Sequence, residues 1–274
     1  MSTSEKSGSI LKEIEPGTIE SILKRDRFLV ITGIVVITIL SWAYMLHLHM
    51  QMMHMDMSIE IAMPNLQPWG QVDFALNFLM WAIMMVAMMT PSAAPTLLVF
   101  ASVNRRRSLN NAPFVPTGVF LSGYIFIWTI FSAVATLVQW FLHKMALLSP
   151  MLESTSDLLG GLILIGAGIY QWTSLKNVCL AHCRSPLDFL MHEWQEGISG
   201  AFMMGVKHGI YCVGCCWILM GLLFVAGVMN LLWVAIIAGF ILIEKVVRGG
   251  VWVGKIAGMI LVAFGILILS GMII

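Results

Sequence analysis

Long apolar stretches alternate with short polar segments along the whole chain. Seven of these stretches are long enough, or nearly so, to cross a bilayer core of about 30 Å, which takes ~20 helical residues. They lie at residues 28–46, 74–101, 117–142, 157–175, 201–227, 230–247 and 251–273. The fifth and sixth are separated by only two residues, so the alternative is six spans with the last pair forming a re-entrant hairpin. The pattern predicts an all-α, polytopic transmembrane helix bundle of about seven (six to seven) spans.

Composition places the chain in the same class. Hydrophobic residues make up 59% of the 274 positions and charged residues 11%, with a mean hydropathy of +0.91. These values are typical of an integral membrane protein, and the apolar runs leave no room for a soluble core. Net charge is +1, and no basic patch with interleaved aromatics occurs. We therefore expect the lipid bilayer as partner and no nucleic acid.

Basic residues orient the predicted bundle. They precede the first span and lie in every second connection after it, with Lys144 alone on the opposite side. By the positive-inside rule the N-terminus is cytoplasmic. The chain then divides into a cytoplasmic segment, 1–27, and a transmembrane domain, 28–274, with an outer loop at 47–72. The first span ends without a small-residue cleavage site, so we expect a retained anchor and not a signal peptide.

The outer loop carries an unusual mixture of methionine and histidine. Residues 47–63 read HLHMQMMHMDMSIEIAM, with three of the seven histidines and six of the 22 methionines. Thioether sulfur and imidazole form a soft donor set that favours Cu(I). On a continued helix, His47, Met50, His54 and Met57 share one face; an unwound segment forms a chelating loop. The alternative is a helix end that only covers a membrane interface. The candidate ligands here are His47, His49, Met53, His54 and Met57.

The second span adds methionines at helical spacing. Met80, Met84 and Met88 continue a line from Asp73 and Asn77, and Met85 and Met89 form a second line beside it. Both lines of methionines run inward from the outer end of the span. They are either ligands that relay a soft ion or side chains packed in the core. Met84 and Met88 are the candidate ligands.

The fifth span opens with AFMMGVKHGIYCVGCCW. Met204, His208, Cys212 and Cys215 fall on one helical face, and Cys216 adjoins it. Thiolates and an imidazole at this spacing bind Cu(I), or the CxxCC run carries out thiol–disulfide chemistry. His208, Cys212, Cys215 and Cys216 are the candidate metal ligands.

A further group of donors falls in a predicted cytoplasmic loop. It contains Cys179, His182 and Cys183, followed by His192 and Glu193. The interpretations are a cytoplasmic acceptor site for metal, or solvated and packed loop residues, because the paired spacing of an ordinary zinc site is missing.

Other features are architectural. Gly250, Gly254 and Gly258 repeat at every fourth position and predict a close helix contact, and Gly160, Gly161, Gly166 and Gly168 predict the same for the fourth span. We expect Glu244 and Lys245 to end the sixth span as interfacial charges.

Three runs of sequence carry a family resemblance. They are MWAIMMVAMMTPSAAP (80–95), YQWTSLKNVCLAHCRSPLDFL (170–190) and MGVKHGIYCVGCCWILMGLLFVAGVMNLLW (204–233). In these runs the chain resembles a bacterial family of uncharacterised, predicted metal-binding integral membrane proteins, over most of residues 74–250. The resemblance implies a multi-helix membrane protein with a metal site. We expect a multi-pass protein of the bacterial inner membrane. It implies no reaction.

Our leading functional hypothesis is a metal-binding membrane protein that captures Cu(I) outside and transfers it or inserts it into a membrane or periplasmic metalloprotein partner. Copper is the expected metal and zinc the alternative. A second hypothesis is a thiol–disulfide or metal-dependent oxidoreductase centred on the CxxCC helix, and a third is an assembly or scaffold subunit. The sequence contains no GxSxG, HExxH or ATP-binding motif. We therefore assign no catalytic residue and leave enzymatic activity open.

Overall fold

The computed structural model describes the backbone of residues 16–59, 69–109, 113–145 and 156–272, and their side chains apart from 16–24 and 52–59. Within these ranges every regular element is a helix, so the all-α prediction is confirmed. The helices are α2 (Pro16–Ile59), α3 (Gln71–Leu109), α4 (Thr117–Lys144), α5 (Asp157–Tyr170), α6 (Ser174–Arg184), α7 (Pro186–Glu193), α8 (Gly197–Gly221), α9 (Leu223–Ala226), α10 (Leu231–Val246) and α11 (Gly250–Leu269).

Among the described residues, five helical stretches are long and apolar enough to cross a membrane. They are Arg25–Gln51, Gln71–Leu109, Thr117–Lys144, Gly197–Ala226 and Gly250–Leu269. The pair α5 and α6, bent by 64°, makes a sixth if it counts as one span. Helix α10, with 16 residues, is about 24 Å long and shorter than a full crossing. The apolar helices fit a membrane protein, and the count of seven and the cytoplasmic N-terminus stay predictions.

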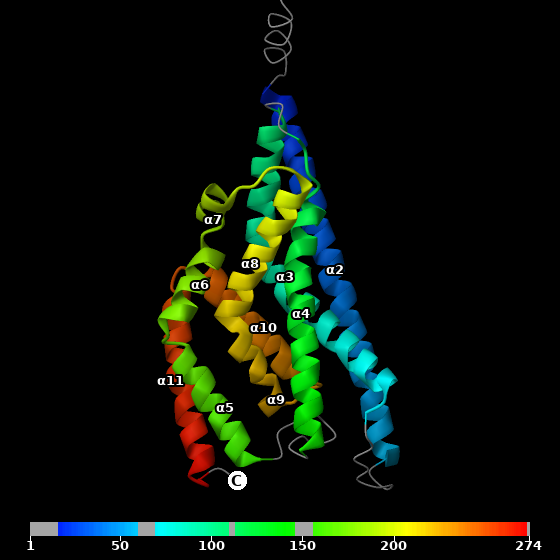
Figure 1. Cartoon of the computed structure of the whole chain (residues 1–274), viewed down its shortest axis with the longest axis vertical. Coiled ribbons are helices and arrows are strands. Elements are labelled where there is room, and N and C mark those ends of the chain that lie inside the picture. The colour runs from blue at the N-terminus through cyan, green and yellow to red at the C-terminus, as the bar shows by residue number, and fades with distance from the viewer. Residues whose placement is uncertain (1–15, 60–68, 110–112, 146–155, 273–274) are drawn as a thin grey trace, which may run out of the picture.

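Helices α3, α4 and α8 form the middle of the bundle. Helix α4 packs along α8, α2 packs along the outside of α3, and α6 covers α8 from the other side (Figure 1). Most of the largest fully buried side chains come from these central helices, among them Trp81, Trp128, Tyr124 and Phe120. Helix α8 is therefore covered by α4 on one side and by α6 on the other.

Glycines bring α5 and α11 into close contact, as the sequence predicts. A Cβ atom at Gly168 would lie 2.6 Å from the carbonyl oxygen of Gly258, and one at Gly258 would lie 2.8 Å from that of Gly168. The two helices run side by side at the edge of the bundle (Figure 1). Their backbones approach this closely because neither glycine carries a side chain.

The chain turns sharply within the predicted fourth span. Helix α5 ends at Tyr170, and Thr173 starts α6 as an N-cap whose side chain accepts a hydrogen bond from Lys176 N at 3.3 Å. The predicted loop after this turn is wrong, because its candidate metal ligands lie in helices. Helix α6 contains Cys179, His182 and Cys183, and helix α7 contains His192 and Glu193. Helix α6 is amphipathic, and Cys179 and Cys183 lie on its buried face at i and i+4.

Candidate metal centre

All five cysteines of the chain gather where α6 meets α8. We call this group the thiol cluster; it contains Cys179, Cys183, Cys212, Cys215 and Cys216, all buried and all free thiols. Helix α6 comes this close because Gly214 has no side chain: a Cβ there would lie 2.7 Å from Cys179 Sγ. Two helices thus contribute thiols to one buried place.

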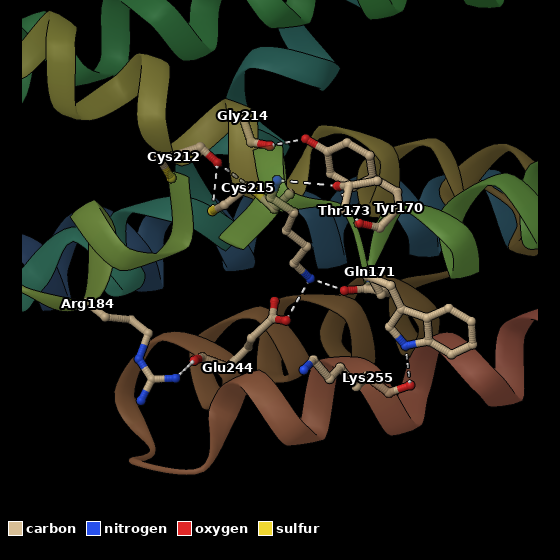
Figure 2. A network of polar contacts seen from close by, with 12 residues as sticks. Tyr170, Gln171, Thr173, Arg184, Cys212, Gly214, Cys215, Glu244 and Lys255 are labelled. Atoms are coloured by element: carbon tan, nitrogen blue, oxygen red, sulfur yellow. Dashed lines mark hydrogen bonds and ion pairs between the residues drawn. The ribbon is translucent and has the colours of Figure 1, made fainter. Parts of the chain in front are cut away.

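The thiols of the cluster lie close together. The thiol of Cys183 on α6 lies near those of Cys212 and Cys215 on α8. Cys215 Sγ donates to the carbonyl oxygen of Cys212 at 3.1 Å (Figure 2), and Cys216 Sγ donates to the same oxygen at 2.9 Å. The spacing of three and four residues on α8 places these sulfurs one helical turn beyond Cys212. The cluster is a compact group of soft donors.

Cys212 is the point where the central helices converge. Its Sγ lies 2.9 Å from Lys245 Nζ of α10 and 3.1 Å from the Tyr124 hydroxyl of α4. Tyr124 also donates to the carbonyl oxygen of Met89 at 3.1 Å, and Lys245 also donates to Ser92 Oγ at 3.1 Å. Side chains of α4 and α10 therefore contact this sulfur of α8, and both are hydrogen-bonded to α3.

His208 lies one turn before Cys212 on α8 and is 2% exposed. Its ring packs against Phe120, Tyr124 and Phe189, with centroid distances of 6.0, 5.7 and 5.4 Å. Nδ1 of His208 is buried and has no hydrogen-bond partner. Buried polar atoms in native proteins are nearly always paired, so this nitrogen has a free donor or acceptor position for a ligand.

A second buried polar network lies beside the cluster. Lys176 Nζ donates to Glu244 Oε1 at 2.6 Å and to Gln171 Oε1 (Figure 2). Arg184 donates to the carbonyl oxygens of Glu244 at 3.4 Å, of Val247 at 2.7 Å and of Arg248 at 2.9 Å. These bonds fasten α6 to the C-terminal end of α10.

The prediction that Glu244 and Lys245 are interfacial charges is wrong. Glu244 is 2% exposed and Lys245 7%. Both are buried because the end of α10 packs against α6, α3 and α8, where Lys176 and Cys212 meet the two charged groups.

The methionines of α3 lie inside the bundle. Met84 is fully buried and Met88 is 2% exposed, and Met80, Met85 and Met89 are also buried. Ser92, one turn beyond Met88, donates no bond to the cluster but accepts one from Lys245, which contacts Cys212. The inner end of this methionine face thus adjoins the thiol cluster.

Of the outer candidates, the structure describes His47 and His49. His49 Nδ1 lies 3.1 Å from the carbonyl oxygen of Met229, and His47 Nε2 lies 3.0 Å from Gln51 Nε2. The side chains of Met53, His54 and Met57 lie outside the described residues. Their role as ligands stays a prediction.

In the part of the chain that the structure describes, no three His, Cys, Asp or Glu side chains are arranged as ligands of one metal ion. The donor set itself fits a soft cation. Thiolate sulfur and neutral imidazole favour Cu(I), and oxygen donors, which favour hard cations, are few around Cys212. A turn of the Cys215 and Cys216 side chains away from the Cys212 carbonyl would free both sulfurs for a metal.

Fold and site together define a helical protein with apolar helices of membrane-crossing length and a buried soft-donor centre. Residues 78–268 match the protein-family model PpoB2, described as a copper chaperone. This match covers well over half of the chain, so the protein belongs to this family and has a copper-related role. No curated protein and no solved structure matches the chain.

Proposed function

We propose that the protein is a membrane copper chaperone that takes up Cu(I) on the outer side, holds it at the thiol cluster and passes it to a membrane or periplasmic metalloprotein. The observation that carries the proposal is the meeting of Cys183 from α6 with Cys212 and Cys215 from α8, one turn from the unpaired nitrogen of His208.

The chemistry of this group suits reversible copper binding. Thiolates bind Cu(I) far better than harder divalent ions, and Cu(I) needs only two or three ligands. With more soft donors than the ion requires, one sulfur can join before another leaves. Exchange between donors of this kind avoids a free ion at any step.

The methionine face of α3 supplies a route in this proposal. Met84 and Met88 are buried along one side of α3, and the helix reaches the environment of Cys212 at Met89 and Ser92. His47, His49, Met53, His54 and Met57 would capture the ion first. Thioethers are weaker ligands than thiolates, so the ion would move inward toward higher affinity.

The membrane setting belongs to the same proposal. We place the protein in the bacterial inner membrane with its N-terminus in the cytoplasm, supported by the five apolar helices and by the distribution of basic residues. The outer histidines and the partner metalloprotein would then lie on the periplasmic side.

Copper affinity of cysteine variants tests the proposal. The full-length protein in lipid nanodiscs is loaded without oxygen, and the Kd for Cu(I) is measured by competition with bicinchoninate. Cys183→Ser is expected to weaken binding at least ~10- to 100-fold, the loss found when even an outer partner of a metal ligand is removed. Cys179→Ser, the matched control on the same helix, is expected to change Kd less, because its sulfur packs against Gly214. Stoichiometric zinc without copper, or an unchanged Kd for Cys183→Ser, contradicts the proposal.

The outer histidines allow a separate prediction. Replacing His47, His49 and His54 together by Ala is expected to slow Cu(I) uptake from a dilute donor while leaving the equilibrium Kd of the thiol cluster nearly unchanged. Stopped-flow loss of the bicinchoninate–copper absorbance measures this rate. A scaffold without a copper route predicts wild-type rates for the triple variant.

The cluster also supports a thiol–disulfide oxidoreductase as second candidate, because Cys183 and Cys212 come from different helices and lie near each other. A redox titration with dithiol buffers distinguishes the two. An oxidisable cysteine pair whose loss abolishes activity but leaves copper content intact favours the redox enzyme.

A further inference from the structure

Buried charges beside the thiol cluster do not balance. Lys176, Glu244 and Lys245 are 1%, 2% and 7% exposed. Lys176 and Glu244 form an ion pair at 2.6 Å. One positive charge, on Lys245, is left over.

The ammonium group of Lys245 lies next to the sulfur of Cys212. Its Nζ lies 2.9 Å from Cys212 Sγ and 3.1 Å from Ser92 Oγ. Within the described ranges no carboxylate forms an ion pair with Lys245, and the neighbouring Glu244 is bound to Lys176. A buried ammonium without a counter-charge is very unfavourable, so this place calls for an anion.

We propose that Lys245 is the built-in counter-ion of a Cu(I)–dithiolate and thereby makes the centre selective for a monovalent metal ion. This inference rests on the proposed function and names what determines its specificity. Cu(I) with two thiolates carries one negative charge, and the ammonium 2.9 Å from Cys212 Sγ neutralises it. Each thiol ligand that is still protonated releases its proton to the solution when the ion binds in this way.

A divalent ion bound by the same two thiolates leaves the centre charged. Zn²⁺ with two thiolates and two neutral ligands is neutral, so the ammonium adds an unbalanced positive charge. Zn²⁺ with three thiolates would carry the single negative charge that Lys245 cancels, but among the described residues no three His, Cys, Asp or Glu side chains are arranged as ligands of one ion. Because net charge is costly in a buried site, the lysine favours Cu(I) over Zn²⁺ at a site with two thiolate ligands.

The test compares two metals in the wild type and in two variants of the full-length protein in lipid nanodiscs. Lys245→Gln removes the charge without adding a thioether, which would itself be a Cu(I) ligand, and Lys245→Arg keeps the charge. Kd for Cu(I) is measured with bicinchoninate and Kd for Zn²⁺ with a zinc indicator, both without oxygen. Lys245→Gln is expected to weaken Cu(I) binding about 10- to 100-fold, the range for outer partners of metal ligands, and to leave Zn²⁺ binding unchanged or tighter. Lys245→Arg is expected to stay within a few-fold of wild type for both metals.

Two controls separate charge from structure. Lys255→Met removes a lysine that lies over the Trp252 ring on α11, at 5.1 Å from the ring centroid, and is expected to change neither Kd. If Lys245→Gln does not fold, as judged by its thermal unfolding midpoint, Lys245→Leu provides the same neutral comparison.

An unchanged ratio of the two Kd values in the neutral variant overturns the inference, whether both metals weaken equally or neither weakens. Such a result leaves the copper chaperone proposal standing as long as the wild type binds Cu(I) and depends on Cys183. A wild type that binds no Cu(I) overturns the proposed function itself.

Discussion

Replacing Glu244 by Gln is expected to destabilise the protein by about 3–5 kcal/mol, the cost of removing one partner of a buried ion pair. The carboxylate lies 2.6 Å from Lys176 Nζ, and the two side chains are 2% and 1% exposed. In the variant, Lys176 stays buried beside amide groups that cannot neutralise it, with Lys245 as a second cation nearby. The lower unfolding midpoint is measured by heating the protein in lipid nanodiscs and determining the folded fraction at each temperature by size-exclusion chromatography.

Glu193→Gln is the matched control. Glu193 also pairs with a lysine, Lys207, but the side chains are 28% and 36% exposed, so the loss is expected to stay below about 1 kcal/mol. The double variant Lys176→Met and Glu244→Met is expected to recover most of the midpoint, because an apolar pair of similar size carries no desolvation cost. Equal midpoints for Glu244→Gln and Glu193→Gln contradict the role given to the buried pair.

The elements whose pattern lies within one segment could be predicted from the sequence. The long apolar runs fix the helical class, and the spacing of Met80, Met84 and Met88 indicates one shared face of α3, which the structure buries. The glycine repeat of α11 likewise predicts close neighbours: Gly258 meets Gly168 of α5, and Gly250 and Gly254 meet Glu244 of α10. In each case a periodicity of about 3.6 residues carries the information.

The complete thiol cluster could not be predicted in this way. Cys183 lies on α6 and Cys212 on α8, with α7 between them, and no local pattern shows that α6 folds back onto α8. The CxxHC run was the available signal, but the missing second metal-ligand pair favoured loop residues instead. Cys179 and Cys183 at i and i+4 on an amphipathic helix would have been a better indication of a buried face.

The buried position of Lys245 was also beyond sequence reasoning. A charged residue at the end of an apolar run normally reaches water, and only its partners decide otherwise. These partners, Cys212 and Ser92, lie 33 and 153 positions away in the sequence. The charge balance around the cluster therefore becomes visible only in three dimensions.

Gly205→Leu is expected to destabilise the protein by about 3 kcal/mol or more, at the upper end of the cost of overpacking. A Cβ at Gly205 would overlap the carbonyl oxygen of Phe120 and lie 2.9 Å from its carbonyl carbon. On the facing helix, a Cβ at Gly123 would overlap the carbonyl oxygen of Phe202. Backbone atoms cannot turn aside as a side chain can, so α4 and α8 must separate.

The same substitution is expected to weaken Cu(I) binding. His208 and Cys212 follow Gly205 by one and two turns on α8, and a shift of this helix moves both away from Tyr124 on α4. Gly221→Leu is the matched control on α8, because nothing lies within 4 Å of a Cβ at that position. We expect Gly221→Leu to keep the wild-type unfolding midpoint and Kd. Equal behaviour of the two variants would mean that the contact between α4 and α8 contributes little, and that α6 and α10 alone hold the thiol cluster in place.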